Sequence, residues 1–325
     1  MDERPAYFAY IFDGQAGAQT VGLHEVHDFS LQHADHTFCW IHLDRSAHQS
    51  RKRLEDANLD HFVIDALIAE ETRPRCTVHG DGVLLNLRGV NLNPGSEPED
   101  MVSIRFWIEK SRVISLALRP LLATSDLRDA IERHEAPSSP GELIARFALR
   151  LADRTEPTVT MLNEKIDLLE EKMLDQANPV PRDHLAEIRR MAIILRRYMI
   201  PQKDALTTLE IEDFEWLANR DRSRLREAAE RVARLGEELD SIRDRAQVVN
   251  DQIMDRRAET MNRQMLILSV VAAFFLPLGL ITGLLGVNVG GIPGTDSPWA
   301  FEILSGLLVL IGFVQLWLFR RLGMF

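Results

Sequence analysis

Two long apolar runs lie close together in the last quarter of the chain. Residues 265–285 form 21 uncharged and mostly apolar positions, and residues 301–319 form a second run with Glu302 near its start. A helix of about 20 apolar residues is long enough to cross the hydrocarbon of a bilayer. The pattern therefore predicts two transmembrane helices, 265–285 and 301–319, joined by a loop over 286–300. A buried helical hairpin in a soluble core is the alternative, which the pairing of two such runs disfavours.

Basic residues flank this apolar region and set its orientation. Three arginines precede the first run and two follow the second: Arg256, Arg257, Arg263, Arg320 and Arg321. The loop 286–300 contains no lysine or arginine. By the positive-inside rule both termini are cytoplasmic, the loop is external and residues 320–325 form a basic cytoplasmic tail. We therefore predict a multi-pass protein of a bacterial-type inner (plasma) membrane.

A heptad pattern of apolar or small residues precedes the first apolar run. Its members are separated by alternating steps of three and four residues: Leu225, Ala228, Val232, Leu235, Leu239, Ile242, Ala246, Val249 and Ile253. An average spacing of 3.5 residues is typical of a coiled-coil seam. We predict a stalk helix over 205–264 that packs on partner helices. These partners come from the same chain or from other copies, and self-association is the simplest source.

The first 155 residues predict a cytoplasmic domain of mixed α and β structure. Five segments are rich in β-branched and aromatic residues, as strands are: 6–12, 37–43, 82–92, 103–109 and 112–118. Segments 51–69 and 123–134 have helical patterns, and residues 156–204 predict a helical hairpin broken near Pro179 and Pro181. The expected fold class is an α+β cytoplasmic domain joined to a long coiled-coil-like stalk helix and a two-helix transmembrane C-terminus.

Composition and charge exclude several classes of function. The 325 residues include 38 Lys and Arg against 49 Asp and Glu, a formal charge of −11, which argues against a general nucleic-acid binder. Two cysteines are too few for a disulfide scaffold and favour a reducing compartment. The sequence has no signal-peptide pattern at its start. It also has no Walker-type glycine loop, nucleophile elbow or His-Glu-x-x-His helix, so we expect neither an enzyme nor a resident cofactor.

The triplet Gly286-Val287-Asn288 ends the first apolar run. Glycine can end a helix in a backbone conformation that is closed to other residues. Asn288 would present an amide oxygen at the membrane surface, and several copies around an axis would form a ring that accepts a hydrated cation. Many helix caps have a similar composition, so the prediction depends on the position of the triplet at the outer end of the first span.

This triplet, in its context, resembles the CorA metal-ion transporter family, and within it the ZntB zinc-transporter branch. The resemblance also includes Met261-Asn262, Pro277-Leu278 and the continuation Gly290-Gly291-Ile292-Pro293-Gly294. Val287 and this loop point to the zinc branch, because magnesium-type members usually carry Met inside the triplet. The resemblance implies a homopentamer with a cytoplasmic funnel, a pore lined by the first span, and a selectivity filter at Gly286, Val287 and Asn288.

The resemblance further implies zinc as the transported ion, taken up with protons by symport across the lipid bilayer. A magnesium, cobalt or nickel channel of the same family and zinc efflux are alternatives, and a membrane-anchored coiled-coil sensor is a remote one. Zinc prefers imidazole and thiolate ligands. The chain has no histidine after His184 and no cysteine after Cys76, so soft ligands in the membrane cannot select zinc.

Helical spacing selects one face of the first span as the pore lining. Counting back from the triplet gives the stripe Asn262, Met265, Ser269, Ala272, Leu276, Gly279 and Gly283. The stripe contains no Asp, Glu, His or Cys, so cations would pass hydrated or against amide and backbone oxygens. Small residues such as Gly279 and Gly283 are equally typical of helix packing in membranes, and that reading stays open.

Two pairs of acidic residues are candidate cation sites at the pore mouths. Asp296 and Glu302 lie at the outer end, and Asp251 and Asp255 lie at the membrane end of the stalk. Each pair also has a plainer explanation, as a charged loop and helix N-terminus or as partners of neighbouring arginines.

A group of histidines and a cysteine near the start of the chain is a candidate cytoplasmic zinc site. Its members fall within 19 residues: His24, His27, His33, His36, Cys39 and His42. If residues 37–43 form a strand, Cys39 and His42 point to opposite faces of the sheet. One ion then cannot bind both of them.

Overall fold

The computed structural model describes residues 7–22, 37–46, 48–70, 73–174, 182–287, 292, 294 and 297–323. The chain divides into two compact units, Met1–Val249 and Asn250–Phe325. The longest helix, α6 (Asn219–Leu285), contributes its first part to one unit and its second part to the other. The α+β domain, the long helix and the two apolar C-terminal helices confirm the fold class expected from the sequence.

A seven-stranded sheet forms the centre of the first unit, within the residues that are described. Its strands are β1 (Phe8–Phe12), β2 (Ala18–Val21), β3 (Phe38–Asp44), β4 (Arg75–His79), β5 (Gly82–Gly89), β6 (Val102–Ile108) and β7 (Arg112–Ala117). They lie in the order β2-β1-β3-β7-β6-β5-β4. The β3–β7 pair is parallel and the other pairs are antiparallel.

The five strands predicted from the sequence are all present, and two more were missed. The missed strands, β2 and β4, are the two edges of the sheet. β2 reads Ala-Gln-Thr-Val and is largely exposed, and β4 reads Arg-Cys-Thr-Val-His with no fully buried position. Edge strands bury little apolar surface, so their sequences lack the alternation that identifies the central strands.

The helical segment predicted over 51–69 is in fact two helices, α1 (His48–Asp56) and α2 (His61–Ile68). Asn58 between them has a left-handed backbone (φ 55°), which ends α1. Asp60 then caps α2 by accepting a hydrogen bond from the Phe62 N–H at 2.8 Å. These two helices pack on one face of the sheet, in a core that includes Leu54, Leu67 and Trp107.

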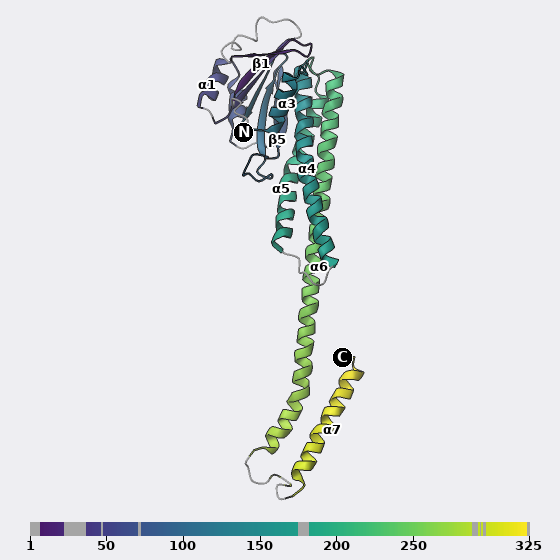
Figure 1. Ribbon diagram of the computed structural model, residues 1–325. Helices are drawn as coiled ribbons and strands as arrows, with labels where there is room; N and C mark the ends of the chain where they lie inside the picture. The colour runs from purple at the N-terminus through teal and green to yellow at the C-terminus, as the bar shows by residue number, and fades with distance from the viewer. Residues whose placement is uncertain are drawn as a thin grey trace. The chain divides into compact units, whose positions relative to one another are not determined.

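The opposite face of the sheet is covered by longer helices, α3 (Leu122–Glu132), α4 (Pro140–Leu174) and α5 (Arg182–Ile211) (Figure 1). Phe147 of α4 packs edge-on against Phe106 of the sheet, with ring centroids 5.1 Å apart. α4 begins before the expected boundary at residues 155/156, and α5 continues past the one at 204/205.

The heptad seam of α6 is buried inside a single chain. From Leu225 to Val249 each of its positions is at most 5 % exposed. α4 and α5 run alongside this part of α6 (Figure 1). Arg231 of α6 forms an ion pair with Asp153 of α4 at 2.5 Å, and a Cβ added at Gly236 would lie 3.7 Å from Met199 of α5. The helices of one chain therefore bury these positions, so of the two sources of partners that the pattern allowed, the same chain supplies them in this stretch.

The second unit consists of the end of α6 and of α7 (Ala300–Arg321). Both helices are long and apolar enough to cross a membrane. Their most apolar 18-residue stretches are only 6 % and 0 % buried, so neither is the core helix of a soluble fold. Apolar helices left uncovered in this way need a bilayer or other chains around them.

Candidate functional site

One face of α6 in the second unit packs against α7. The half-buried positions of this stretch recur at helical spacing: Val270, Phe274, Pro277, Leu278 and Ile281. A Cβ added at Gly312 of α7 would lie 3.7 Å from the Phe274 ring, so glycine lets the two helices approach closely. The side-chain amide of Gln315, also on α7, donates a hydrogen bond to the Ala273 carbonyl at 3.4 Å.

The stripe predicted from the sequence lies on the other side of α6. All seven positions from Asn262 to Gly283 are exposed in the single chain. At 100° per residue, the stripe is centred about 155° away from the face that meets α7. Within the described chain nothing lies within 4 Å of a Cβ added at Gly279 or Gly283. This face is therefore available to other copies of the chain, to an ion path or to both.

Gly286 follows the last residue of α6 and donates its N–H to the Thr282 carbonyl at 2.9 Å. It is not among the glycines with a positive φ, so the expected left-handed helix end is wrong. A different constraint applies, because an added Cβ would lie 2.9 Å from the Thr282 carbonyl oxygen. Val287 is 50 % exposed. Asn288 lies outside the described residues.

Pro277 interrupts the hydrogen bonding of α6 in the middle of the span. Proline has no N–H, so the Ala273 carbonyl four residues earlier loses its helical donor. Gln315 supplies a replacement donor from the neighbouring helix. This contact was not predicted from the sequence, although a glutamine inside an apolar span is itself a signal of a polar partner.

The structure describes three of the four acidic residues that are candidate cation sites. Glu302 is exposed in the first turn of α7, where a carboxylate interacts favourably with the helix dipole. Asp251 and Asp255 are exposed and one helical turn apart on α6. Asp296 lies outside the described residues.

The N-terminal group of candidate zinc ligands does not come together as one site. His24, His27, His33 and His36 lie outside the described residues. Cys39 is buried against Ala9 on one face of the sheet. His42 lies on the other face, where it stacks on Phe8 and its Nδ1 is 2.8 Å from the Ser115 hydroxyl. A single ion cannot reach both Cys39 and His42, so the six-residue ligand set is wrong.

The shifted pKa values of Cys39 and His42 also suit a structural role for these two residues. Burial raises the pKa of the Cys39 thiol to about 12, which keeps it neutral. Burial, with a smaller effect of Arg128, lowers the pKa of His42 to about 4. In the part of the chain that is described, no group of three or more His, Cys, Asp or Glu side chains could hold a metal ion.

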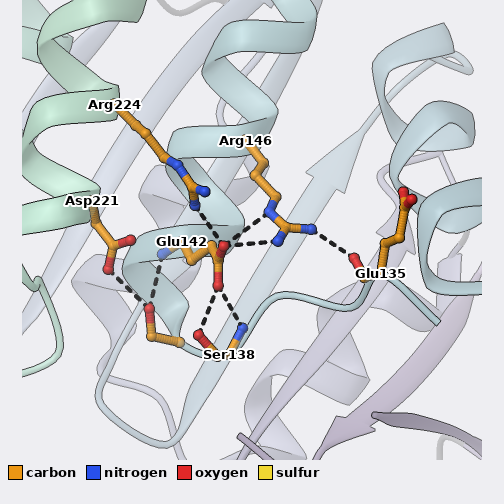
Figure 2. Close-up of polar contacts among 7 residues, drawn as sticks. Glu135, Ser138, Glu142, Arg146, Asp221 and Arg224 are labelled. Atoms are coloured by element: carbon orange, nitrogen blue, oxygen red, sulfur yellow. Dashed lines mark hydrogen bonds and ion pairs between the residues drawn. The ribbon is translucent and has the colours of Figure 1, made fainter. Parts of the chain in front are cut away.

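A polar cluster joins the start of α4 to the start of α6 (Figure 2). Glu142 accepts hydrogen bonds from the Ser138 N–H at 2.9 Å and from the Ser138 hydroxyl at 2.7 Å. Its other oxygen accepts from Arg146 at 2.8 Å and from Arg224 at 2.5 Å. Burial raises the pKa of Glu142, but these hydrogen bonds outweigh it and hold the pKa at about 2.

A second contact in the same cluster runs from Ser139 to Asp221. The Ser139 hydroxyl donates to the Asp221 carboxylate at 3.0 Å and accepts from the Glu142 N–H at 3.0 Å. The run Ser139-Pro140-Gly141-Glu142 is a capping-box sequence with proline at the first helical position. That signal was present in the sequence and would have placed the start of α4.

Comparisons with known proteins agree on one family. The family model "CorA-like Mg2+ transporter protein" matches residues 35–321. A divalent cation transporter, CmaX of Pseudomonas aeruginosa, is 38 % identical over 324 residues, covering 99 % of this chain and 97 % of the relative. The zinc transport protein ZntB of Pectobacterium carotovorum is 38 % identical over 317 residues, with coverage of 97 % and 95 %.

Solved structures give the same result. The full-length CmaX structure matches with a TM-score of 0.85 at 36 % identity, covering 99 % of this chain and 100 % of that one. The CorA magnesium transporter of Methanocaldococcus jannaschii has a TM-score of 0.81 at 17 % identity over 99 % of both chains, a likeness of fold alone. The membrane triplet and its neighbours predicted this relationship from the sequence, and the chain belongs to the CorA family of metal-ion transporters.

Proposed function

We propose that this protein transports divalent cations across a membrane as a homopentamer, with zinc as its main cargo. Membership of a transporter family agrees with the expectation that the chain is not an enzyme. The names of two relatives at 38 % identity, a divalent cation transporter and a zinc transport protein, support the cargo. The observation that carries the proposal is the exposed stripe on α6, opposite the face covered by α7.

In the proposed assembly, five copies of α6 surround the ion path with this stripe facing inward, and α7 packs outside. Gly279 and Gly283 let neighbouring α6 helices approach closely. Hydrated ions would meet the filter Gly286, Val287 and Asn288 at the outer end, where amide oxygens replace bulk water. The stripe carries no ionisable side chain, so an apolar constriction with Leu276 can close the path by dewetting.

The proposed topology places both termini in the cytoplasm of a bacterial cell and the loop 286–300 outside. Arg320 and Arg321 at the end of α7 support that orientation. Glu302 and Asp296 would then raise the cation concentration at the outer mouth, and Asp251 and Asp255 would do so at the inner mouth.

We further propose zinc uptake by proton symport, with the coupling groups at the mouths of the path. Glu302 is the only ionisable residue within the two predicted spans, 265–285 and 301–319, so a proton relay through the membrane has no intermediate carriers. A channel for several divalent metals is the second candidate. The absence of histidine and cysteine from both spans favours it, since nothing there prefers zinc by ligand chemistry.

Zinc uptake into sealed proteoliposomes tests the proposal. The wild type should take up zinc, and Asn288→Ala should abolish most of that uptake while assembling normally. Gln252→Ala, an exposed amide on α6 that belongs neither to the stripe nor to the triplet, serves as the matched control and should keep normal uptake. Normal flux in Asn288→Ala would refute the filter.

Two further measurements in the same liposomes test the choice of metal and the coupling to protons. Competition by excess magnesium, cobalt or nickel distinguishes a zinc transporter from a broad divalent channel. A proton gradient imposed at fixed outside pH should increase zinc uptake if protons are co-transported. Uptake that follows the outside pH and ignores the gradient would contradict symport.

A further inference from the structure

A pocket of about 400 Å³ opens in the first unit beside the carboxyl ends of three strands. β5 and β7 are each antiparallel to β6, and β7 is parallel to β3, so the ends of β3, β5 and β7 point the same way. Helix α5 supplies the facing wall, with Arg190, Arg197 and Tyr198. Ligand sites of α/β sheets commonly lie outside strand ends of this kind.

Guanidinium groups dominate the lining of this pocket. Six arginines contribute to it: Arg45, Arg88, Arg105, Arg119, Arg190 and Arg197. The acidic residues of the lining are Glu70, Glu99 and Asp100. This excess of cations stands in a chain whose formal charge is −11, so it is a local feature and does not reflect the overall composition.

Backbone carbonyl groups hold two of these arginines in place. Arg105 is only 2 % exposed, and its Nη1 donates to the Leu67 carbonyl at 2.8 Å. Arg45 donates to the carbonyls of Ala69 at 2.7 Å and of Glu70 at 3.0 Å. A carbonyl oxygen orients a guanidinium group without supplying a full negative charge. Both groups are therefore positioned before any ligand arrives.

Tyr198 organises the α5 side of the pocket. The Arg88 guanidinium lies 4.4 Å from the centroid of its ring, and that of Arg197 lies 5.0 Å from it. Arg197 also donates to the Tyr198 hydroxyl at 3.0 Å. Arg190 pairs with the buried carboxylate of Glu99 at 2.5 Å, so that acid is already engaged by a cation.

The positive charges of the arginines repel one another. Burial, followed by the charges of Arg45, Arg88 and Arg75, lowers the pKa of Arg105 to about 10. An anion in the pocket would relieve this repulsion. Phosphate oxygens match the planar donor fork of arginine especially well, because two parallel N–H groups can bind them at once.

We propose that this pocket binds a small phosphate-bearing molecule of nucleotide size. Its volume lies within the range of small-molecule sites and is several times that of a single phosphate group. The pocket shares no residue with the candidate ion path on α6, and nothing in the transport proposal requires it. Its test therefore uses binding as the readout, so that it succeeds or fails independently of zinc uptake.

The probes are ATP, inorganic pyrophosphate and inorganic phosphate, titrated into the full-length protein in detergent by calorimetry. We expect ATP or pyrophosphate to bind. Pyrophosphate binding as tightly as ATP would show that the phosphates alone are recognised, and tighter ATP binding would add a nucleoside contact. The proposal is overturned if neither probe binds at about 1 mM, which corresponds to roughly 4 kcal/mol.

Substitutions separate the pocket from general charge effects. Arg45→Gln and Arg119→Gln should each weaken binding about tenfold or more, since each removes a charge-assisted hydrogen bond. Arg119 is exposed, so its variant should fold even if Arg45→Gln does not. Arg220→Gln, an exposed arginine outside the pocket, should bind like the wild type. Equal affinities in all three variants would also overturn the proposal.

Discussion

The Glu142 carboxylate should be a major source of stability for the first unit, and Glu142→Gln should reveal it. The side chain is 7 % exposed and accepts hydrogen bonds from Ser138, Arg146 and Arg224 (Figure 2). Its pKa falls from an ordinary value of 4.5 to about 2 in the fold. At about 1.4 kcal/mol per pKa unit, ionisation of this group stabilises the fold by roughly 3 kcal/mol.

This contribution depends on pH in a direction fixed by the lowered pKa. Above the unfolded pKa of 4.5 the carboxylate is charged in both states and the full stabilisation is present. As the pH falls toward 2 the folded carboxylate becomes protonated and the stabilisation is lost. Near pH 3 less than about half of it should remain.

Thermal melts of the full-length protein in detergent, followed by far-ultraviolet circular dichroism, measure the effect. At pH 7 we expect Glu142→Gln to lower the melting temperature of the first unit by about 6–12 °C, using about 2–4 °C per kcal/mol. Glu164→Gln, an exposed carboxylate on the same helix, is the control and should change little. A Glu142→Gln melting temperature equal to that of the wild type, or a difference that does not narrow from pH 7 to pH 3, would show that the ionised Glu142 carboxylate does not stabilise the fold.

Three further substitutions test other parts of the structure. Leu239 is fully buried in the seam, so Leu239→Ala should lower stability by about 2–5 kcal/mol without changing the oligomer seen by native mass spectrometry; dissociation into monomers would instead place the seam between chains. Gln315→Leu removes the donor to the Ala273 carbonyl, and we expect the second unit to lose about 1 kcal/mol in a thermal melt followed by circular dichroism. An unchanged melt would mean that the helix around Pro277 does not need this contact. Gly286→Ala should strongly reduce zinc uptake, because its Cβ would lie 2.9 Å from the Thr282 oxygen. Gly306→Ala has open space around the added atom and is its control; full uptake in Gly286→Ala would argue against a constrained turn.

Local patterns predicted most of the architecture because the elements bury distinct apolar faces. The central strands and both apolar spans could be found in this way, whereas edge strand β2 could not, since its residues are largely exposed. The heptad pattern of α6 predicted burial correctly but not the partner. Spacing within one helix records which face is covered, and the helices that cover it come from residues far away in the sequence.

The candidate sites also differ in whether their residues are close together in the sequence. The stripe on α6 could be proposed from spacing alone because all of its members belong to one helix. The contact between Gln315 and the Ala273 carbonyl joins residues 42 positions apart, and only the fold brings them together. The arginine-lined pocket draws on β5, β6, α5 and the segments after β3 and β7, so no local pattern predicted it.

A thiol-block experiment asks whether the stripe on α6 lines the ion path. Ala272→Cys places a thiol on the stripe, and Val270→Cys places one on the face toward α7. Zinc uptake is measured before and after a charged methanethiosulfonate reagent, with the parent protein reporting any effect on Cys39 and Cys76. If the stripe lines the path, the reagent blocks uptake in Ala272→Cys and leaves uptake in Val270→Cys and the parent unchanged. Full uptake by Ala272→Cys after mass spectrometry shows its thiol modified, or block confined to Val270→Cys, would show that the stripe does not line the path.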